Sequence, residues 1–146
     1  MTMPVTDEQE ATLHAQLAGN FDEHLRLLDS LDPAAARTGY SALVSAAFSL
    51  AAERRFPEGT PASEIIDYVA DVRSRTDRTA AIDPVTAERV LLAVSADEKI
   101  GDIDRRTSFQ TQLVLLAALI ADAHLGAQDL DAFMLRARRR ADRWLS

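Results

Sequence analysis

The strongest constraint in the sequence is an unbroken run of nine apolar residues at positions 113–121. A helix that is apolar on every side has to be covered on every side, by protein or by lipid. The run is far shorter than the roughly 20 apolar residues that a helix needs to cross a bilayer. We therefore expect no membrane association and predict a buried central helix over residues 105–125, around which the other helices pack.

The composition favours helices over strands. The chain of 146 residues is the size of one ordinary domain and contains 26 Ala but only five Gly and five Pro. Ala is the best helix former, and a fold with many strands would need more turn residues. These features predict an all-α fold, a single-domain bundle of about six helices over residues 1–146. Within it, we expect the N-terminal helical pair at residues 1–31 to be the most loosely docked part.

Capping signals predict where the helices begin. Each expected helix start is preceded by a residue whose side chain can accept a hydrogen bond from the first turn. These residues are Thr6, Asn20, Asp32, Asp83 and Asp104. Gly126 is expected to end the central helix in the left-handed conformation. The predicted helices cover residues 7–18, 21–31, 40–56, 61–75, 84–95, 105–125 and 130–145.

Helical spacing predicts which side chains are buried. In the central helix, large residues should face the core, and Ala117, Ala118 and Ala121 should meet a closely approaching helix. In three other helices the residues expected in the core are Phe21, Leu25 and Leu28; Ile65, Ile66, Tyr68, Val69 and Val72; and Val85, Val90, Leu91, Leu92 and Val94.

A five-residue pattern, Ile-Asp-x-x-Thr, occurs at residues 82–86 and again at residues 103–107. One interpretation is an internal repeat of the fold. The other is that both are helix starts at which Asp is the N-cap. We favour the second interpretation, because the residues that follow the two matches do not align without a gap.

The charge and the residue usage limit the function and the location. The net charge is −7, so the surface as a whole repels phosphate, and we expect neither general nucleic-acid binding nor binding to anionic membranes. The chain has no Cys, which excludes disulfides and thiolate metal sites. We also find no secretion signal at the N-terminus and expect a cytoplasmic protein. The single Lys against 15 Arg, with the excess of Ala, suggests GC-rich bacterial coding sequence.

The motifs of common enzymes and metal sites are absent from the sequence. We find no phosphate-binding glycine loop and no nucleophile elbow. The three His lie on three different predicted helices, and the acidic segment at residues 96–104 does not match a calcium-binding loop. We therefore predict no catalytic residues, no metal ligands and no cofactor, and we lean against an enzyme.

The candidate functional site is a cluster of cations in the last predicted helix. Arg136, Arg139, Arg140 and Arg143 gather beside Trp144, and Arg138 lies among them in the sequence. Two readings are open. The cluster could bind an acidic partner, or it could simply solvate the outer face and complement the helix dipole.

The leading hypothesis for the function follows from the cation cluster and from the absence of site chemistry. It is a non-catalytic interaction or regulatory protein that binds a protein partner, most simply another copy of itself. The alternatives are a DNA-binding regulator that uses the same cations, and a small helical bundle that binds a ligand or catalyses a reaction.

Overall fold

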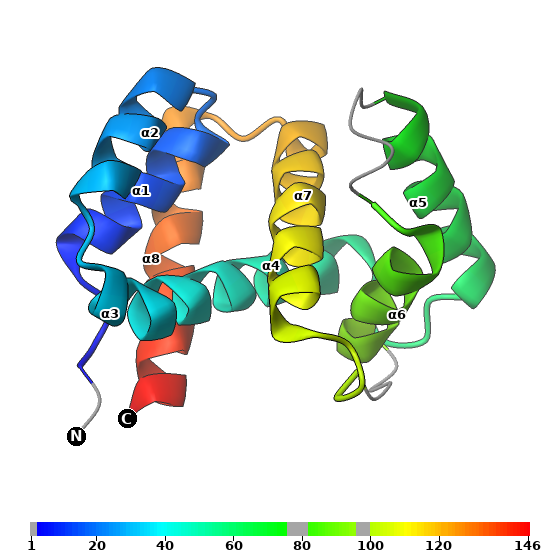
Figure 1. The fold of residues 1–146 in the computed structure, drawn as a ribbon. Coiled ribbons are helices and arrows are strands. Elements are labelled where there is room, and N and C mark those ends of the chain that lie inside the picture. The colour runs from blue at the N-terminus through cyan, green and yellow to red at the C-terminus, as the bar shows by residue number, and fades with distance from the viewer. Residues whose placement is uncertain (1–2, 76–81, 96–99) are drawn as a thin grey trace. The chain divides into compact units, whose positions relative to one another are not determined.

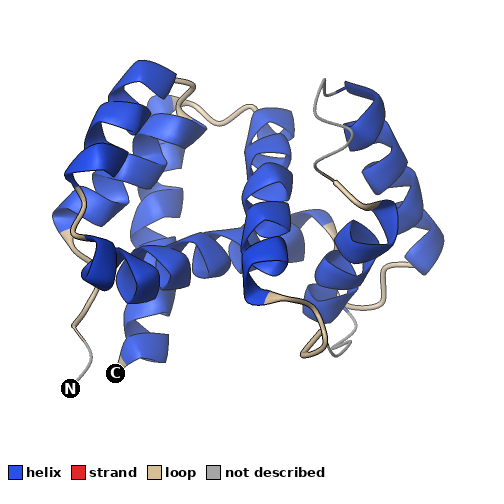
Figure 2. Ribbon diagram, viewed as in Figure 1, coloured by secondary structure: helices blue, strands red, loops and turns tan. Residues whose placement is uncertain are grey.

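A computed structural model describes residues 3–75, 82–95 and 100–146 of the chain. Within these ranges the protein contains helices and loops and no strand, which confirms the predicted all-α fold (Figures 1 and 2). The elements are α1 (Asp7–Leu17), α2 (Phe21–Ser30), α3 (Pro33–Ala35), the π-helical turn η1 (Ala36–Tyr40), α4 (Ser41–Arg55), α5 (Ala62–Arg75), α6 (Pro84–Ser95), α7 (Arg105–Ala123) and α8 (Ala127–Leu145).

Contacts within the chain divide it into two compact units. Unit 1 consists of Met1–Ala47 and Ile120–Ser146, and unit 2 consists of Phe48–Leu119. Helices α4 and α7 each begin in one unit and end in the other. That all of residues 1–146 form a single domain stays a prediction.

The helix starts confirm the capping signals. Thr6 accepts a hydrogen bond from the backbone N–H of Gln9, and the Gln9 side chain accepts one from the N–H of Thr6, so the capping box is complete. Asn20 caps α2, and Asp32 caps α3 with Pro33 in the first turn. Each cap satisfies an N–H group that would otherwise lack a partner at the start of a helix.

The two Ile-Asp-x-x-Thr segments are two copies of the same helix start. Asp83 accepts hydrogen bonds from both the N–H and the hydroxyl of Thr86, each at 2.9 Å. Asp104 accepts the equivalent bonds from Thr107, at 3.1 and 3.3 Å. The interpretation as Asp-capped helix starts is therefore confirmed.

The end of the central helix differs from the prediction. We expected Gly126 to adopt the left-handed conformation, but its φ is −71° and it is the N-cap of α8. The left-handed residue is His124, with φ +50°. The turn is thus tighter than expected, and α8 begins at Ala127 rather than near Leu130. The sequence rule favoured Gly because glycine reaches positive φ without steric cost.

The central helix is also less enclosed than expected. Large side chains on one side of α7 are buried, among them Leu115, Leu116 and Leu119. On the other side Ala117 and Ala118 are partly exposed and Ala121 is exposed, so the predicted close packing of the alanines is wrong. An alanine presents little apolar surface, and leaving it in contact with water costs little. No described helix is both long enough and apolar enough to cross a membrane.

Unit 1 is built from both ends of its sequence. Its core contains Leu13 of α1, Tyr40 of η1, Leu43 of α4, and Phe133 and Met134 of α8, each at most 6% exposed. Helix α1 packs against α2, η1 and α8. The loose docking of residues 1–31 stays a prediction, but several hydrogen bonds fasten α1 and the segment before it.

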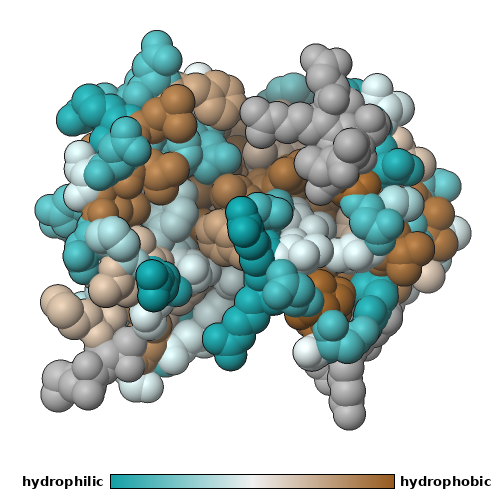
Figure 3. Space-filling model, viewed as in Figure 1, coloured by the Kyte–Doolittle hydropathy of each residue, from teal (hydrophilic) through white to brown (hydrophobic). Residues whose placement is uncertain are grey.

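Helix α2 buries a different face from the one expected. Phe21 and Leu25 are more than half exposed, at 62% and 56%, and Leu28 is 40% exposed, so their predicted burial is wrong. The buried residue is His24, whose ring Nδ1 lies 2.8 Å from the carbonyl oxygen of Thr12. His24 lies beside the apolar stripe, so α2 meets α1 with the neighbouring side of the helix. Apolar side chains are visible at the surface over α1 and α2 (Figure 3).

Unit 2 packs α5 against α6 around aromatic and aliphatic side chains. The rings of Phe56 and Tyr68 meet edge to face with centroids 5.3 Å apart, and the Arg55 guanidinium lies 4.7 Å from the Phe56 ring centre. Six of the residues expected in this core are buried: Ile65, Tyr68, Val69, Val72, Val90 and Leu91. Ile66 and Val85 are exposed, at 47% and 61%, because each sits beside the buried stripe of its helix rather than on it. Leu92 and Val94 are partly exposed.

Candidate functional site

Helix α8 has one buried face and one charged face. Its buried residues are Leu130, Phe133, Met134, Ala137 and Ala141. Arg136, Arg139 and Arg143 are exposed, Arg140 is partly exposed, and Trp144 is 53% exposed. At about 100° per residue these five side chains span roughly 140° of the helix circumference. We call this surface, Arg136, Arg139, Arg140, Arg143 and Trp144, the arginine face.

Arg136, Arg139 and Arg143 are the fully exposed arginines of the arginine face. Among the residues that the structure describes, Arg136, Arg139 and Arg143 form no ion pair. The sequence prediction placed these cations on one face, and the structure brings them together there.

Arg138 belongs to the same cluster in sequence but has a structural role. Its Nη1 donates hydrogen bonds to Asp7 at 2.6 Å and to Glu10 at 2.7 Å, and its Nη2 donates to the carbonyl oxygen of Val5 at 2.8 Å. The hydrogen bonds that Arg138 donates to Asp7 and then to Glu10 raise the pKa of its guanidinium. Asp142, one turn further along α8, accepts a hydrogen bond from the N–H of Val5 at 2.8 Å. These bonds hold α1 and the residues before it against α8.

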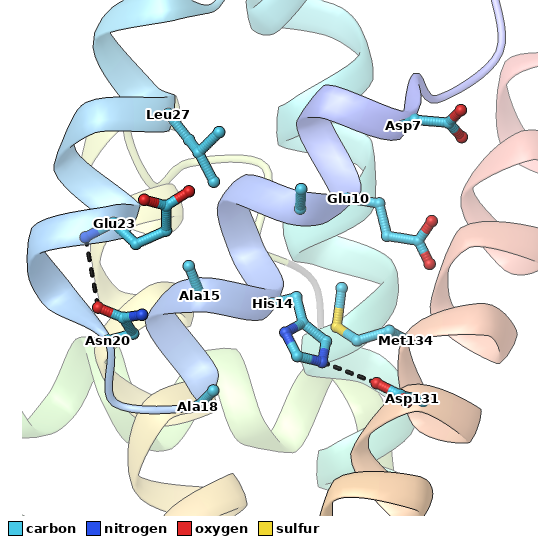
Figure 4. Close-up of a pocket in the computed structure, with 11 residues that line it drawn as sticks. Asp7, Glu10, His14, Ala15, Ala18, Asn20, Glu23, Leu27, Asp131 and Met134 are labelled. Atoms are coloured by element: carbon cyan, nitrogen blue, oxygen red, sulfur yellow. Dashed lines mark hydrogen bonds and ion pairs between the residues drawn. The ribbon is translucent and has the colours of Figure 1, made fainter.

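A groove of about 580 Å³ extends over α1 between α2 and α8 in unit 1 (Figure 4). Its apolar surface comes mainly from alanines of α1 with Leu27 and Met134. Four carboxylates surround it: Asp7, Glu10, Glu23 and Asp131. We call this feature the acidic groove. Sequence reasoning missed it, because α8, which completes its walls, lies at the other end of the sequence from α1 and α2.

His14 lies in the acidic groove and links two of its walls. Its imidazole points from α1 toward Asp131 on α8, with the side chain of Met134 beside it (Figure 4). The Nε2 atom of His14 lies 2.8 Å from Oδ1 of Asp131. The only hint in the sequence is that Glu10 and His14 are four residues apart, which places both on one face of α1. Among the described residues, no group of three or more His, Asp or Glu side chains is arranged to hold a metal ion.

The acidic groove carries an excess of negative charge. Arg138 is the shared partner of Asp7 and Glu10, and Arg26 pairs with Glu23. The hydrogen bond from Arg26 lowers the pKa of the exposed Glu23 carboxyl, so this group is ionised at neutral pH. Among the residues that the structure describes, Asp131 pairs with the imidazole of His14. Four carboxylates thus face two guanidinium groups.

The acidic segment at residues 96–104 was considered as a calcium-binding loop. Its described acidic residues, Asp102 and Asp104, have separate partners. Asp102 accepts hydrogen bonds from both Nη atoms of Arg89, at 2.7 and 2.9 Å, which lower the pKa of the Asp102 carboxyl. Asp104 caps α7. Asp97 and Glu98 lie outside the described residues.

Comparison with known proteins gave no relative: no family model, no curated protein and no solved structure matches this chain.

Proposed function

We propose that this chain is a non-catalytic interaction protein of the bacterial cytoplasm that associates with further copies of itself through the arginine face. The observation that supports the proposal is the contrast along α8. Arg138 is used within the molecule, whereas Arg136, Arg139 and Arg143 are exposed and form no ion pair with the described residues. They lie beside Trp144, which is 53% exposed.

The chemistry of the arginine face suits a protein interface. Arg and Trp are enriched among the residues that carry most of the binding energy at interfaces. A guanidinium is weakly hydrated and fits a carboxylate with two parallel hydrogen bonds. The net charge of −7 makes acidic surface on a second copy the nearest available partner.

The helix dipole does not account for the whole cluster. A cation favours the negative end of a helix only within about the last turn. Arg143 lies in the last turn of α8, but Arg136 and Arg139 lie further from the end at Leu145. The helix dipole therefore does not explain the positions of Arg136 and Arg139.

The oligomeric state of two charge-reversed variants tests this proposal. We expect the wild type to associate in sedimentation velocity and R139E/R143E to be monomeric. The matched control is R105E/R106E, which makes the same change in charge at exposed arginines of α7. A wild type that is monomeric at every concentration, or association that both variants retain, would contradict the proposal.

A phosphate backbone is the alternative acceptor for the same arginines. DNA binding through phosphates weakens steeply with salt, because bound counterions are released. The arginine face favours this alternative locally, but the net charge of −7 opposes it. A gel-shift experiment at low salt decides, since an absent or salt-independent shift excludes the DNA-binding regulator.

A further inference from the structure

We propose that the acidic groove of one copy binds the arginine face of another, so that copies associate head to tail. The inference rests on the proposed function, in which the arginine face mediates self-association, and it names the receiving surface. A contact of this kind joins two different surfaces of the same protein, unlike a two-fold dimer in which one surface meets itself.

The two surfaces are complementary in charge. The acidic groove has four carboxylates and only two guanidinium partners, whereas three arginines of the arginine face form no ion pair with described residues. A carboxylate that already accepts one guanidinium still has acceptor sites, because its two oxygens offer about four lone-pair positions. Glu10, Glu23 and Asp131 can therefore receive arginines from a second copy without losing their present partners.

The two surfaces are also complementary in apolar character and size. The apolar part of the groove, with Ala11, Ala15, Leu27 and Met134, suits the indole of Trp144 and the methylene stems of the arginines. At about 580 Å³ the groove is as large as cavities that enclose small molecules, which measure about 300–1,000 Å³. It has room for more than one side chain.

The arginine face cannot fill the groove of its own molecule. Asp131 lines the groove from the first half of α8, and Arg143 lies 12 residues later on the same helix. These two residues are about 18 Å apart along the helix axis and about 120° apart around it. Because α8 is one continuous helix, the contact has to form between copies.

Two variants, each defective on one surface, test the head-to-tail contact. The face variant is R139E/R143E, and the groove variant is E23K/D131K, which leaves the Arg138 partners Asp7 and Glu10 intact. We expect each variant alone to lose association by at least about tenfold, since each places like charges opposite one another. An equimolar mixture should associate again with a 1:1 composition, because the groove of one variant fits the arginine face of the other.

The single tryptophan gives a readout at the contact itself. In a mixture of the groove variant with the face variant that also carries W144F, the only indole belongs to the groove variant. We expect its fluorescence to shift to shorter wavelength on mixing, as Trp144 leaves water for the groove. Circular dichroism of each variant shows that it is folded, and the milder pair E23Q/D131N should weaken association in the same direction.

The outcomes separate the two proposals. If the groove variant associates as the wild type does while the face variant does not, the head-to-tail contact is wrong and the proposed function stands. If both variants lose association but their mixture does not regain it, the head-to-tail contact is also wrong. If the wild type never associates, both proposals fail.

Discussion

Arg138 donates a hydrogen bond to Glu10 at 2.7 Å across 128 positions of the chain, and the two residues fasten the last helix to the first. Arg139, the next residue, is exposed and forms no ion pair with any residue that the structure describes. Adjacent residues of α8 thus have different tasks, one inside the molecule and one at its surface.

Replacing Arg138 by Met should destabilise the protein, because Asp7, Glu10 and the carbonyl of Val5 all lose a donor. Hydrogen bonds to charged groups contribute about 1.5–3 kcal/mol each when fully buried. Because Asp7 is exposed and Glu10 is partly exposed, we expect a total loss of about 1–2 kcal/mol. The midpoint of urea unfolding measures it. The matched control, Arg139→Met, should change the stability by less than about 0.5 kcal/mol; equal effects would refute the division of tasks.

Gly39 should not tolerate a larger side chain. A Cβ added at Gly39 would lie 2.8 Å from Nε2 of Gln9, and Gln9 is held by the capping box with Thr6. We expect Gly39→Ala to cost about 1–2 kcal/mol, through overpacking and loss of the cap. Gly101→Ala is the control, since a Cβ there meets nothing within 4 Å. In thermal melts the added cost of Gly39→Ala should largely disappear when Gln9 is also Ala, and a cost that persists would point to another cause.

The stability should fall in alkaline solution because of Tyr40. Burial raises the pKa of the Tyr40 hydroxyl from 10.0 to about 12. Below pH 10 the group is protonated in both states; between pH 10 and 12 the unfolded state releases the proton first, so stability decreases as pH rises. The loss through this window is about 2–3 kcal/mol at most. Urea unfolding as a function of pH should show the decline in the wild type and a shallower one in Tyr40→Phe. Parallel curves would show that Tyr40 is not the cause.

Polar substitutions on the exposed stripe of α2 should leave the fold intact. Leu25 is 56% exposed and Leu13 of α1 is fully buried. We expect Leu25→Ser to change the free energy of unfolding by less than about 0.5 kcal/mol, and Leu13→Ala to cost about 2–5 kcal/mol. Denaturant titration of both variants in dilute solution is the measurement. A large loss in Leu25→Ser would mean that α2 packs by the face that the sequence pattern suggested.

The sequence was a good guide to features that depend on near neighbours. The starts of α1, α2, α6 and α7 were predicted correctly, because an N-cap side chain and the backbone N–H that donates to it lie three residues apart. The left-handed residue after α7 was predicted to be Gly126, because the rule for helix ends considers only the steric cost of a positive φ. In the structure His124 adopts this conformation instead. Local sequence was therefore sufficient to predict these helix starts, but not the helix end at which His124 adopts a positive φ.

Features that depend on distant partners were not predictable in the same way. Phe21 and Leu25 have perfect helical spacing for a core, yet α2 meets α1 with the side that carries His24, which bonds to Thr12. The arginines of α8 look alike in sequence, and only the position of Asp7 and Glu10 separates Arg138 from the others. The acidic groove exists only once three helices are in place.

Unit 1 consists of two segments that are distant in the sequence, so it cannot finish folding until both have been synthesised. Glu10 and Arg138 are 128 positions apart, and a chain grows at about 5–20 residues per second, so α1 exists for roughly 6–25 seconds before α8 has been made. During that time α1 can pack against α2 and η1 but not against α8. A nascent chain stalled before α8 would therefore expose the part of unit 1 that the buried residues of α8 cover in the finished protein.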